Sequence, residues 1–198
     1  MKISTSTDLS RRRHLGYTLI EALVSMALLL IVVGAVLTCH LTGLRFNLAI
    51  QSHTQYAQAA RAALSCMTEE IQSATSLQVG SGSATNFVPA GATNLQAGNA
   101  LRIYPSTNAT QFIYYFYDAG TSNLDKIPLA ATNIIITVAT GITNSHVFSM
   151  QNFAGTVLTN SQNNAVMRVL LQMSFISPIA GVSAGYQAGA QVTRRNIL

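Results

Sequence analysis

The sequence has 198 residues, which suits one globular domain with an additional membrane segment. Only 9% of its residues are charged and its mean hydropathy is +0.33, which is too apolar for a typical soluble protein. The net charge is +5 and is concentrated in residues 1–15, so we expect no nucleic-acid partner bound through a basic patch in the rest. Cys39 and Cys66 fall far apart in one expected helix, so neither a disulfide framework nor a zinc site is predicted.

A basic cluster precedes a long apolar run near the N-terminus. Arg11, Arg12 and Arg13 come first, and the run extends from Ala22 to Cys39. With its apolar flanks the run is long enough to cross a bilayer core of about 30 Å. Because the positive charges come before the run, the N-terminus is expected in the cytoplasm and the C-terminal part across the membrane. A secretory signal peptide would have a shorter apolar core and a cleavage site after it, whereas an uncleaved signal anchor stays an alternative.

Apolar residues then recur every three or four positions, which predicts an amphipathic helix. This stripe comprises Phe46, Ile50, His53, Ala57, Ala60, Leu64, Met67 and Ile71. No proline occurs before Pro89, so one helix is expected from about Thr18 to about Ala74, first in lipid and then amphipathic. Because the stripe is short and rich in alanine, we expect it to pack on its own domain rather than in a free coiled coil.

The amino-acid composition of the chain changes after Ser76. Residues 80–99 are rich in small and polar residues, which predicts loops with at most short strands. Strands are predicted at Ala100–Tyr104, Gln111–Tyr117, Asn133–Val138, His146–Phe153 and Val166–Ile176, with a short element at Leu124–Leu129. Another small-residue loop is expected over residues 178–189, before a short last strand that ends at Arg194. The fold class is therefore α+β, with a long helix packed on an antiparallel β-sheet head.

The sequence offers little for catalysis. The histidines are scattered, and neither a nucleophile motif, a P-loop nor a glycine fingerprint is present. Asp118 and Asp125 flank a turn and could hold a cation, but turn formation by Asp and Asn is the favoured interpretation. Glu69 and Glu70 are expected to be solvated. We therefore predict no enzyme activity, no cofactor and no metal.

Tyr114, Tyr115 and Tyr117 lie close together in one predicted strand. They could form a binding surface. The alternation of aromatic residues in a half-buried strand explains the cluster as well, and we favour that interpretation.

One carboxylate, Glu21, lies just inside the apolar run. A charge within a membrane span costs roughly 2.5–3.5 kcal/mol on insertion scales, so such a residue usually has a function. The segment Thr18-Leu19-Ile20-Glu21 also fits a capping box, with Thr18 as N-cap. Capping alone does not require a carboxylate at the edge of the bilayer.

The segment from Gly16 to Glu21, behind the arginine cluster, resembles the prepilin leader motif of type IV pilins and of the pseudopilins of type II secretion systems. The resemblance implies that a prepilin peptidase cuts between Gly16 and Tyr17 and then methylates the new amino group of Tyr17. The family usually has Phe at that position, so Tyr17 is a mild departure. The resemblance also implies that Glu21 pairs with the amino terminus of a neighbouring subunit during assembly.

With this resemblance the chain divides into four parts. They are a leader peptide at 1–16, a transmembrane helix at 17–44, an amphipathic helix at 45–75 and a β-rich head at 76–198. The segments Arg61–Ile71 and Val192–Asn196 resemble the helix end and the C-terminus of J-type minor pseudopilins and related minor pilins. They imply a subunit at or near the filament tip.

The resulting expectation is a structural minor pseudopilin or minor pilin. Its partners would be prepilin peptidase, other minor and major pseudopilins or pilins, an inner-membrane assembly platform and membrane lipid. It would span the bacterial inner membrane once, with its head in the periplasm, and then enter a periplasmic pseudopilus or a surface pilus.

Two alternatives stay open. One is a minor pilin that captures DNA or a surface, which requires five basic side chains of the head to converge: Arg102, Lys126, Arg168, Arg194 and Arg195. The other is a signal-anchored envelope protein outside any filament.

Overall fold

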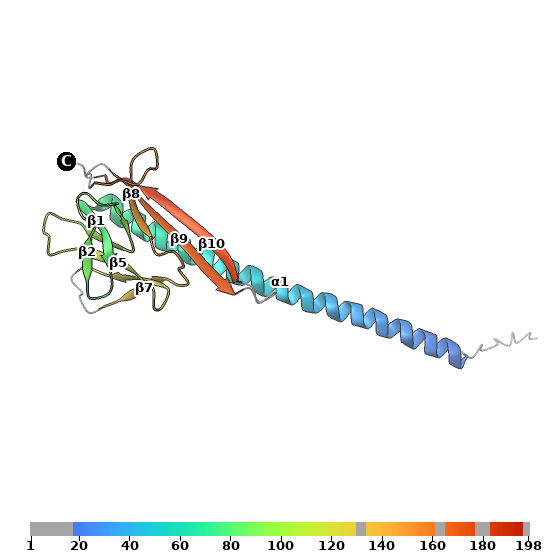
Figure 1. The fold of residues 1–198 in the computed structure, drawn as a ribbon. Coiled ribbons are helices and arrows are strands. Elements are labelled where there is room, and N and C mark those ends of the chain that lie inside the picture. The colour runs from blue at the N-terminus through green and yellow to red at the C-terminus, as the bar shows by residue number, and fades with distance from the viewer. Residues whose placement is uncertain (1–17, 130–133, 161–164, 177–182, 196–198) are drawn as a thin grey trace, which may run out of the picture. The chain divides into compact units, whose positions relative to one another are not determined.

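The computed structural model describes residues 18–129, 134–160, 165–176 and 183–195 (Figure 1). The chain forms two compact units, Met1–Arg45 and Phe46–Leu198. A single helix, α1 (Leu19–Ser73), begins in the first unit and ends in the second. The predicted helix is therefore confirmed to within one residue at each end.

Within the described residues, the second unit contains ten strands in two antiparallel sheets. The six-stranded sheet has the order β2-β1-β4-β5-β6-β7 and the four-stranded sheet has the order β10-β9-β8-β3. The strands are β1 (Ser76–Gly82), β2 (Phe87–Pro89), β3 (Ala97–Gly98), β4 (Ala100–Tyr104), β5 (Ile113–Asp118), β6 (Asn123–Ile127), β7 (Ile136–Ala139), β8 (Phe148–Gln151), β9 (Val166–Ile176) and β10 (Ser183–Val192). The predicted α+β class, with a long helix and an antiparallel head, is confirmed.

The strand predictions succeed where β-forming residues are dense. The bounds of β4 and β9 agree with the prediction, and β5 to β8 differ by a few residues. The loop predicted over residues 178–189 is wrong from Ser183 onward, because β10 pairs with β9 in register along its whole length. The region 80–99 contains short stretches of strand, as predicted: the end of β1, which pairs with β2 and β4, then β2 and β3. In both places backbone pairing orders small residues that carry little strand signal of their own.

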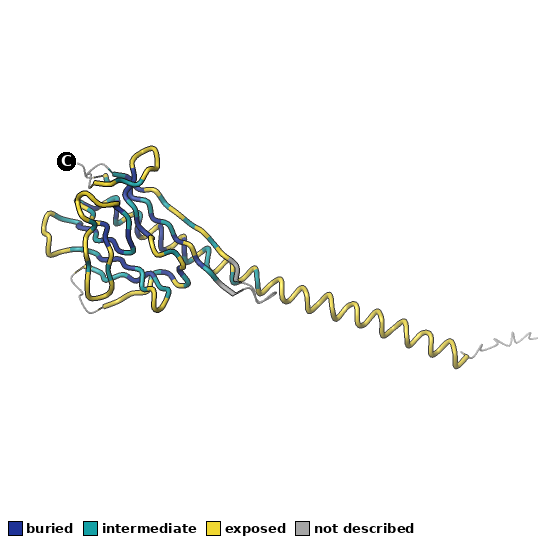
Figure 2. The backbone as a smooth tube through the Cα atoms, viewed as in Figure 1, coloured by how far each residue is buried: buried dark blue, intermediate teal, exposed yellow. Residues whose placement is uncertain are grey.

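The core lies between α1 and the two sheets (Figure 2). From α1 it receives Ala60, Ala63, Leu64, Met67 and Ile71. The lower half of the predicted stripe is thus confirmed. The prediction is wrong for the start of the stripe, because Phe46 and Ile50 are 56% and 64% exposed.

The six-stranded sheet buries side chains on both faces. Leu101, Ile103 and Tyr115 belong to the main core that includes α1. Tyr114 and Phe116 belong to a second, smaller cluster that contains no residue of α1. Since neighbouring residues of a strand point to opposite faces, this smaller cluster occupies the face turned away from the helix. We call it the outer face.

The two sheets approach closely where β1 passes β3. A Cβ atom at Gly98 would lie 2.0 Å from the carbonyl oxygen of Gly80. Only a residue without a side chain permits this approach, so Gly98 is required where the two sheets meet.

Candidate functional site

The N-terminal signal is described only in part. Gly16, Tyr17 and the arginines at 11–13 lie outside the described residues. The described part begins at Thr18, where the backbone N–H of Glu21 donates to Thr18 Oγ1 at 3.4 Å. The carbonyl of Thr18 accepts the first helical hydrogen bond, from Ala22 at 3.1 Å. Thr18 therefore caps α1 as the sequence predicts, and Glu21 occupies the first turn.

Glu21 has no hydrogen-bond or ion-pair partner for its carboxylate among the residues that the structure describes. It is exposed, as is every residue of α1 up to Leu48. A carboxylate at a helix N-terminus is favoured by the helix dipole, but that effect is worth only about 0.3–1 kcal/mol. The side chain is thus available to a group outside this chain.

The first part of α1 has the length and composition of a single membrane span. Its most apolar window has a mean hydropathy of 2.7 over 18 residues, and none of these residues is buried. Burial in lipid is the ordinary way to remove so much apolar surface from water. The apolar N-terminal helix is consistent with single-pass membrane anchoring.

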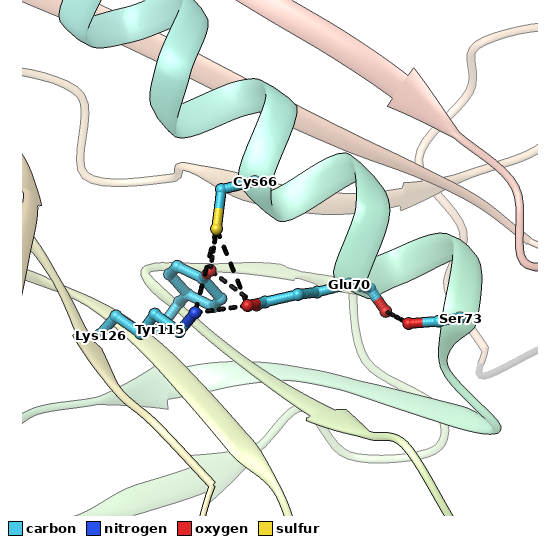
Figure 3. Close-up of polar contacts among 5 residues, drawn as sticks. All are labelled: Cys66, Glu70, Ser73, Tyr115 and Lys126. Atoms are coloured by element: carbon cyan, nitrogen blue, oxygen red, sulfur yellow. Dashed lines mark hydrogen bonds and ion pairs between the residues drawn. The ribbon is translucent and has the colours of Figure 1, made fainter.

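The head contains a polar cluster that ties α1 to the six-stranded sheet (Figure 3). Tyr115 Oη of β5 donates to Glu70 Oε2 of α1 at 2.7 Å, and Lys126 Nζ of β6 forms an ion pair with Glu70 Oε1. Cys66 Sγ lies 3.7 Å from both Glu70 Oε1 and Tyr115 Oη, and 3.9 Å from Lys126 Nζ. The expectation that Glu70 is solvated is therefore wrong, because the side chain turns toward the sheet, while Glu69 is exposed.

The surroundings of Tyr115 keep its hydroxyl protonated. Burial is the largest cause that raises the pKa of Tyr115 above the usual value for tyrosine, and its hydrogen bond to the Glu70 carboxylate raises it further. A neutral tyrosine hydroxyl beside a carboxylate acts as a donor. Through Glu70, the cluster therefore connects α1 to two strands of the six-stranded sheet.

The C-terminal segment is attached to the end of the helix. The backbone N–H of Arg195 donates to the carbonyl of Gln72 at 3.0 Å, and Arg194 Nη1 donates to the carbonyl of Thr75. Because the last carbonyls of a helix lack intrahelical donors, these contacts satisfy polar groups at its C-terminal end.

The remaining candidate residues have structural contacts. Asp118 accepts hydrogen bonds within its own turn, from Gly120 N at 3.0 Å and Thr121 Oγ1 at 2.9 Å. Asp125 instead accepts from Thr137 Oγ1 at 2.8 Å. Within the described ranges, no group of three or more His, Cys, Asp or Glu side chains is placed to hold a metal ion.

Neither Tyr114 and Tyr115 nor the basic residues Arg102 and Lys126 share one surface of the head. Tyr114 and Tyr115 are both buried, but on opposite faces of the sheet. Lys126 meets the helix through Glu70, whereas Arg102 lies against Phe87 and Phe112 on the outer face. The two basic residues therefore belong to different surfaces of the head.

Sequence reasoning missed the partners of Glu70 and Arg102. The hydrogen bond between Tyr115 and Glu70 joins residues 45 positions apart, and the Lys126–Glu70 ion pair joins residues 56 positions apart. The spacing of Cys66 and Glu70 does predict that both lie on one side of the helix. Nothing in the local sequence indicates which strand that side faces.

Residues 11–37 match the family model described as the prokaryotic N-terminal methylation motif. No curated protein matches the chain. No solved structure matches it either. The matched range contains the arginine cluster, Gly16, Tyr17, Glu21 and most of the apolar run. This motif supports a type IV pilin- or pseudopilin-like protein.

Proposed function

We propose that this protein is a structural subunit of a type IV pilus or a type II secretion pseudopilus. The match of residues 11–37 to the N-terminal methylation motif is the observation that carries the proposal. Prepilin peptidase would cut between Gly16 and Tyr17 and methylate the amino group of Tyr17. Arg11, Arg12 and Arg13 would hold the leader on the cytoplasmic side while the head enters the periplasm.

Glu21 would act in assembly. Its carboxylate has no described partner within the chain and lies in the first turn of an apolar helix. Next to lipid, an unpaired carboxylate and an unpaired amino terminus are both unfavourable. A pair formed by Glu21 of one subunit and the methylated terminus of another would offset both penalties, and it would set the register in which subunits dock.

We further propose a minor subunit that acts at or near the filament tip. The support is the resemblance of Arg61–Ile71 and Val192–Asn196 to J-type minor pseudopilins and related minor pilins. Arg195 of the second segment bonds to Gln72, the residue that follows the first segment in α1. Its partners would be other minor and major pilins or pseudopilins and the inner-membrane assembly platform.

Mass spectrometry of the mature N-terminus tests the proposal. The full gene is expressed in cells with and without prepilin peptidase, and the protein is purified from membranes. We expect an N-methylated Tyr17 terminus only in cells that have the peptidase. A chain that keeps Met1 in both strains, or one cut after the apolar run, would instead indicate a signal-anchored or secreted envelope protein.

A further inference from the structure

The outer face of the six-stranded sheet carries a pocket. Its volume is about 330 Å³, and it is lined by residues 84–86, Arg102, Phe112, Tyr114 and Ile127. These residues come from the β1–β2 connection, β4, β5 and its preceding loop, and the end of β6. The pocket therefore lies over the smaller apolar cluster.

Among the described residues that line this pocket, Arg102 is the one with a charged side chain. Its guanidinium carbon lies 4.3 Å from the ring centroid of Phe87, 4.5 Å from that of Phe112 and 5.7 Å from that of Tyr114. Aromatic rings contact a guanidinium through its planar face, so its N–H groups stay free to bind an acceptor in the plane.

No such acceptor is present for Arg102 in the part of the chain that the structure describes. Its Nε is buried without a hydrogen-bond partner, and the ion pair between described residues is Lys126–Glu70. With Nε enclosed, the donors left for a ligand are the N–H groups on Nη1 and Nη2. They form a fork that matches the two oxygens of a carboxylate.

The rim of the pocket is held in place. Tyr114 Oη lies 2.9 Å from the carbonyl oxygen of Ser83 and 3.0 Å from that of Asn86, and it shares its proton between them. Burial raises the pKa of Tyr114 to about 12, so the hydroxyl stays a donor at ordinary pH. The side chain of Asn99 also exchanges two hydrogen bonds with the backbone of Gly82, each 2.9 Å long. A rim fixed in this way needs little ordering when a ligand binds.

The geometry points to a binding site for a carboxylate that is attached to an apolar group. Arg102 supplies one positive charge, which suits a monoanion better than a phosphate dianion. Phe112, Ile127 and the ring of Tyr114 supply apolar walls for the rest of the ligand. Such a carboxylate belongs either to an acidic side chain of another polypeptide or to a small organic acid.

Binding to the full-length protein in lipid nanodiscs tests this site. The protein is labelled with ¹⁵N-arginine, and its arginine side-chain signals are followed during titration. The probes are 3-phenylpropionate, a blocked Ala-Phe-Glu-Ala peptide, and the neutral amide counterpart of each. We expect at least one acid to shift the Arg102 signal and to bind about tenfold or more tightly than its own amide. Tighter binding of the peptide assigns the site to a protein partner, whereas tighter binding of 3-phenylpropionate assigns it to an organic acid.

Two variants and one further probe complete the test. Arg102→Lys keeps the charge but loses the planar fork, so we expect the affinity for the acid to fall about tenfold. Arg168→Lys, in β9 of the other sheet, should leave it unchanged. Equal affinity for acids and amides in the wild-type protein, or no shift of the Arg102 signal with any probe, would overturn the proposal, and neither result depends on whether a variant folds. Inorganic phosphate that binds as tightly as the acids would overturn the choice of a carboxylate.

Discussion

Tyr115, at the centre of the six-stranded sheet, donates a hydrogen bond from its hydroxyl to Glu70 Oε2 of α1, with 2.7 Å between the two oxygens. The ring of Tyr115 is fully buried and forms part of the core that packs on the helix. One residue thus contributes apolar contact and a directed polar bond to the same interface. The bond forms only when Glu70 lies opposite Tyr115. It therefore favours one position of the helix along its axis relative to the sheet.

Removal of this hydroxyl should destabilise the head. Tyr115→Phe keeps the ring but leaves Glu70 with one donor fewer, so we expect a loss of about 1–2 kcal/mol in the free energy of unfolding. The chain has no tryptophan, so near-UV circular dichroism reports the tyrosines and suits the measurement. A double-mutant cycle with Glu70→Gln should give a coupling energy of about 1 kcal/mol.

Glu69→Gln is the matched control, because Glu69 is the exposed neighbour of Glu70. It should change the free energy of unfolding by less than about 0.5 kcal/mol. If Tyr115→Phe changes stability no more than this control does, the bond to Glu70 contributes nothing to the helix–sheet contact.

Two tyrosines of the head, Tyr114 and Tyr115, should titrate late. The pKa of Tyr114 is raised to about 12 by burial, and that of Tyr115 is raised as well. The unfolded chain therefore loses these protons at lower pH than the folded chain, and stability should fall as the pH rises above about 10. Absorbance at the tyrosinate band should show two late-titrating groups that become normal in denaturant.

Tyr114→Phe should remove one late-titrating group and reduce the loss of stability between about pH 10 and 12. A wild-type protein whose tyrosines all titrate together near pH 10 would contradict the burial of both rings.

The contact between the two sheets should not tolerate a methyl group added at Gly98. In Gly98→Ala the new Cβ would meet the backbone carbonyl of Gly80, which cannot rotate away. We expect a loss of about 1–3 kcal/mol, measured as a lower midpoint of thermal unfolding. In Gly185→Ala of β10 the nearest atom outside the neighbouring residues is 3.9 Å away, so this variant should unfold close to the wild-type temperature. Equal midpoints for both variants would show that the sheets separate at little cost.

Glu21 should be needed for assembly but not for processing. Glu21→Ala keeps the cleavage site, so mass spectrometry should still find the N-methylated Tyr17. The variant would lack the carboxylate that offsets the charge of the neighbouring amino terminus, so it should be absent from sheared filaments or pseudopili.

Glu69→Ala, which removes a carboxylate from the head end of the same helix, should enter filaments normally. Normal incorporation of Glu21→Ala would remove the assembly role while leaving the processing of the chain intact.

Local chemistry made part of this protein predictable. The helix is defined by three- and four-residue spacing and by the absence of proline, and its start is marked by Thr18. The strands β4 and β9 follow from dense β-forming residues and, in β9, from an apolar face that recurs at every second residue from Met167 to Met173. The N-terminal signal is a contiguous motif, so the sequence indicated the class of protein without any knowledge of the head.

Other features depend on pairing between distant segments. The small residues of β10 become a strand only because β9 offers a complete hydrogen-bonding edge. Glu70 leaves solvent because the fold brings Tyr115 and Lys126 to its side of the helix. In the sequence Arg102 is one of five basic residues of the head, and it becomes a candidate carboxylate-binding residue because the fold places it against Phe87 and Phe112. Residue type and spacing therefore determined the helix and the N-terminal signal, whereas long-range packing decided how Glu70 is paired and left Arg102 without an acceptor among the described residues.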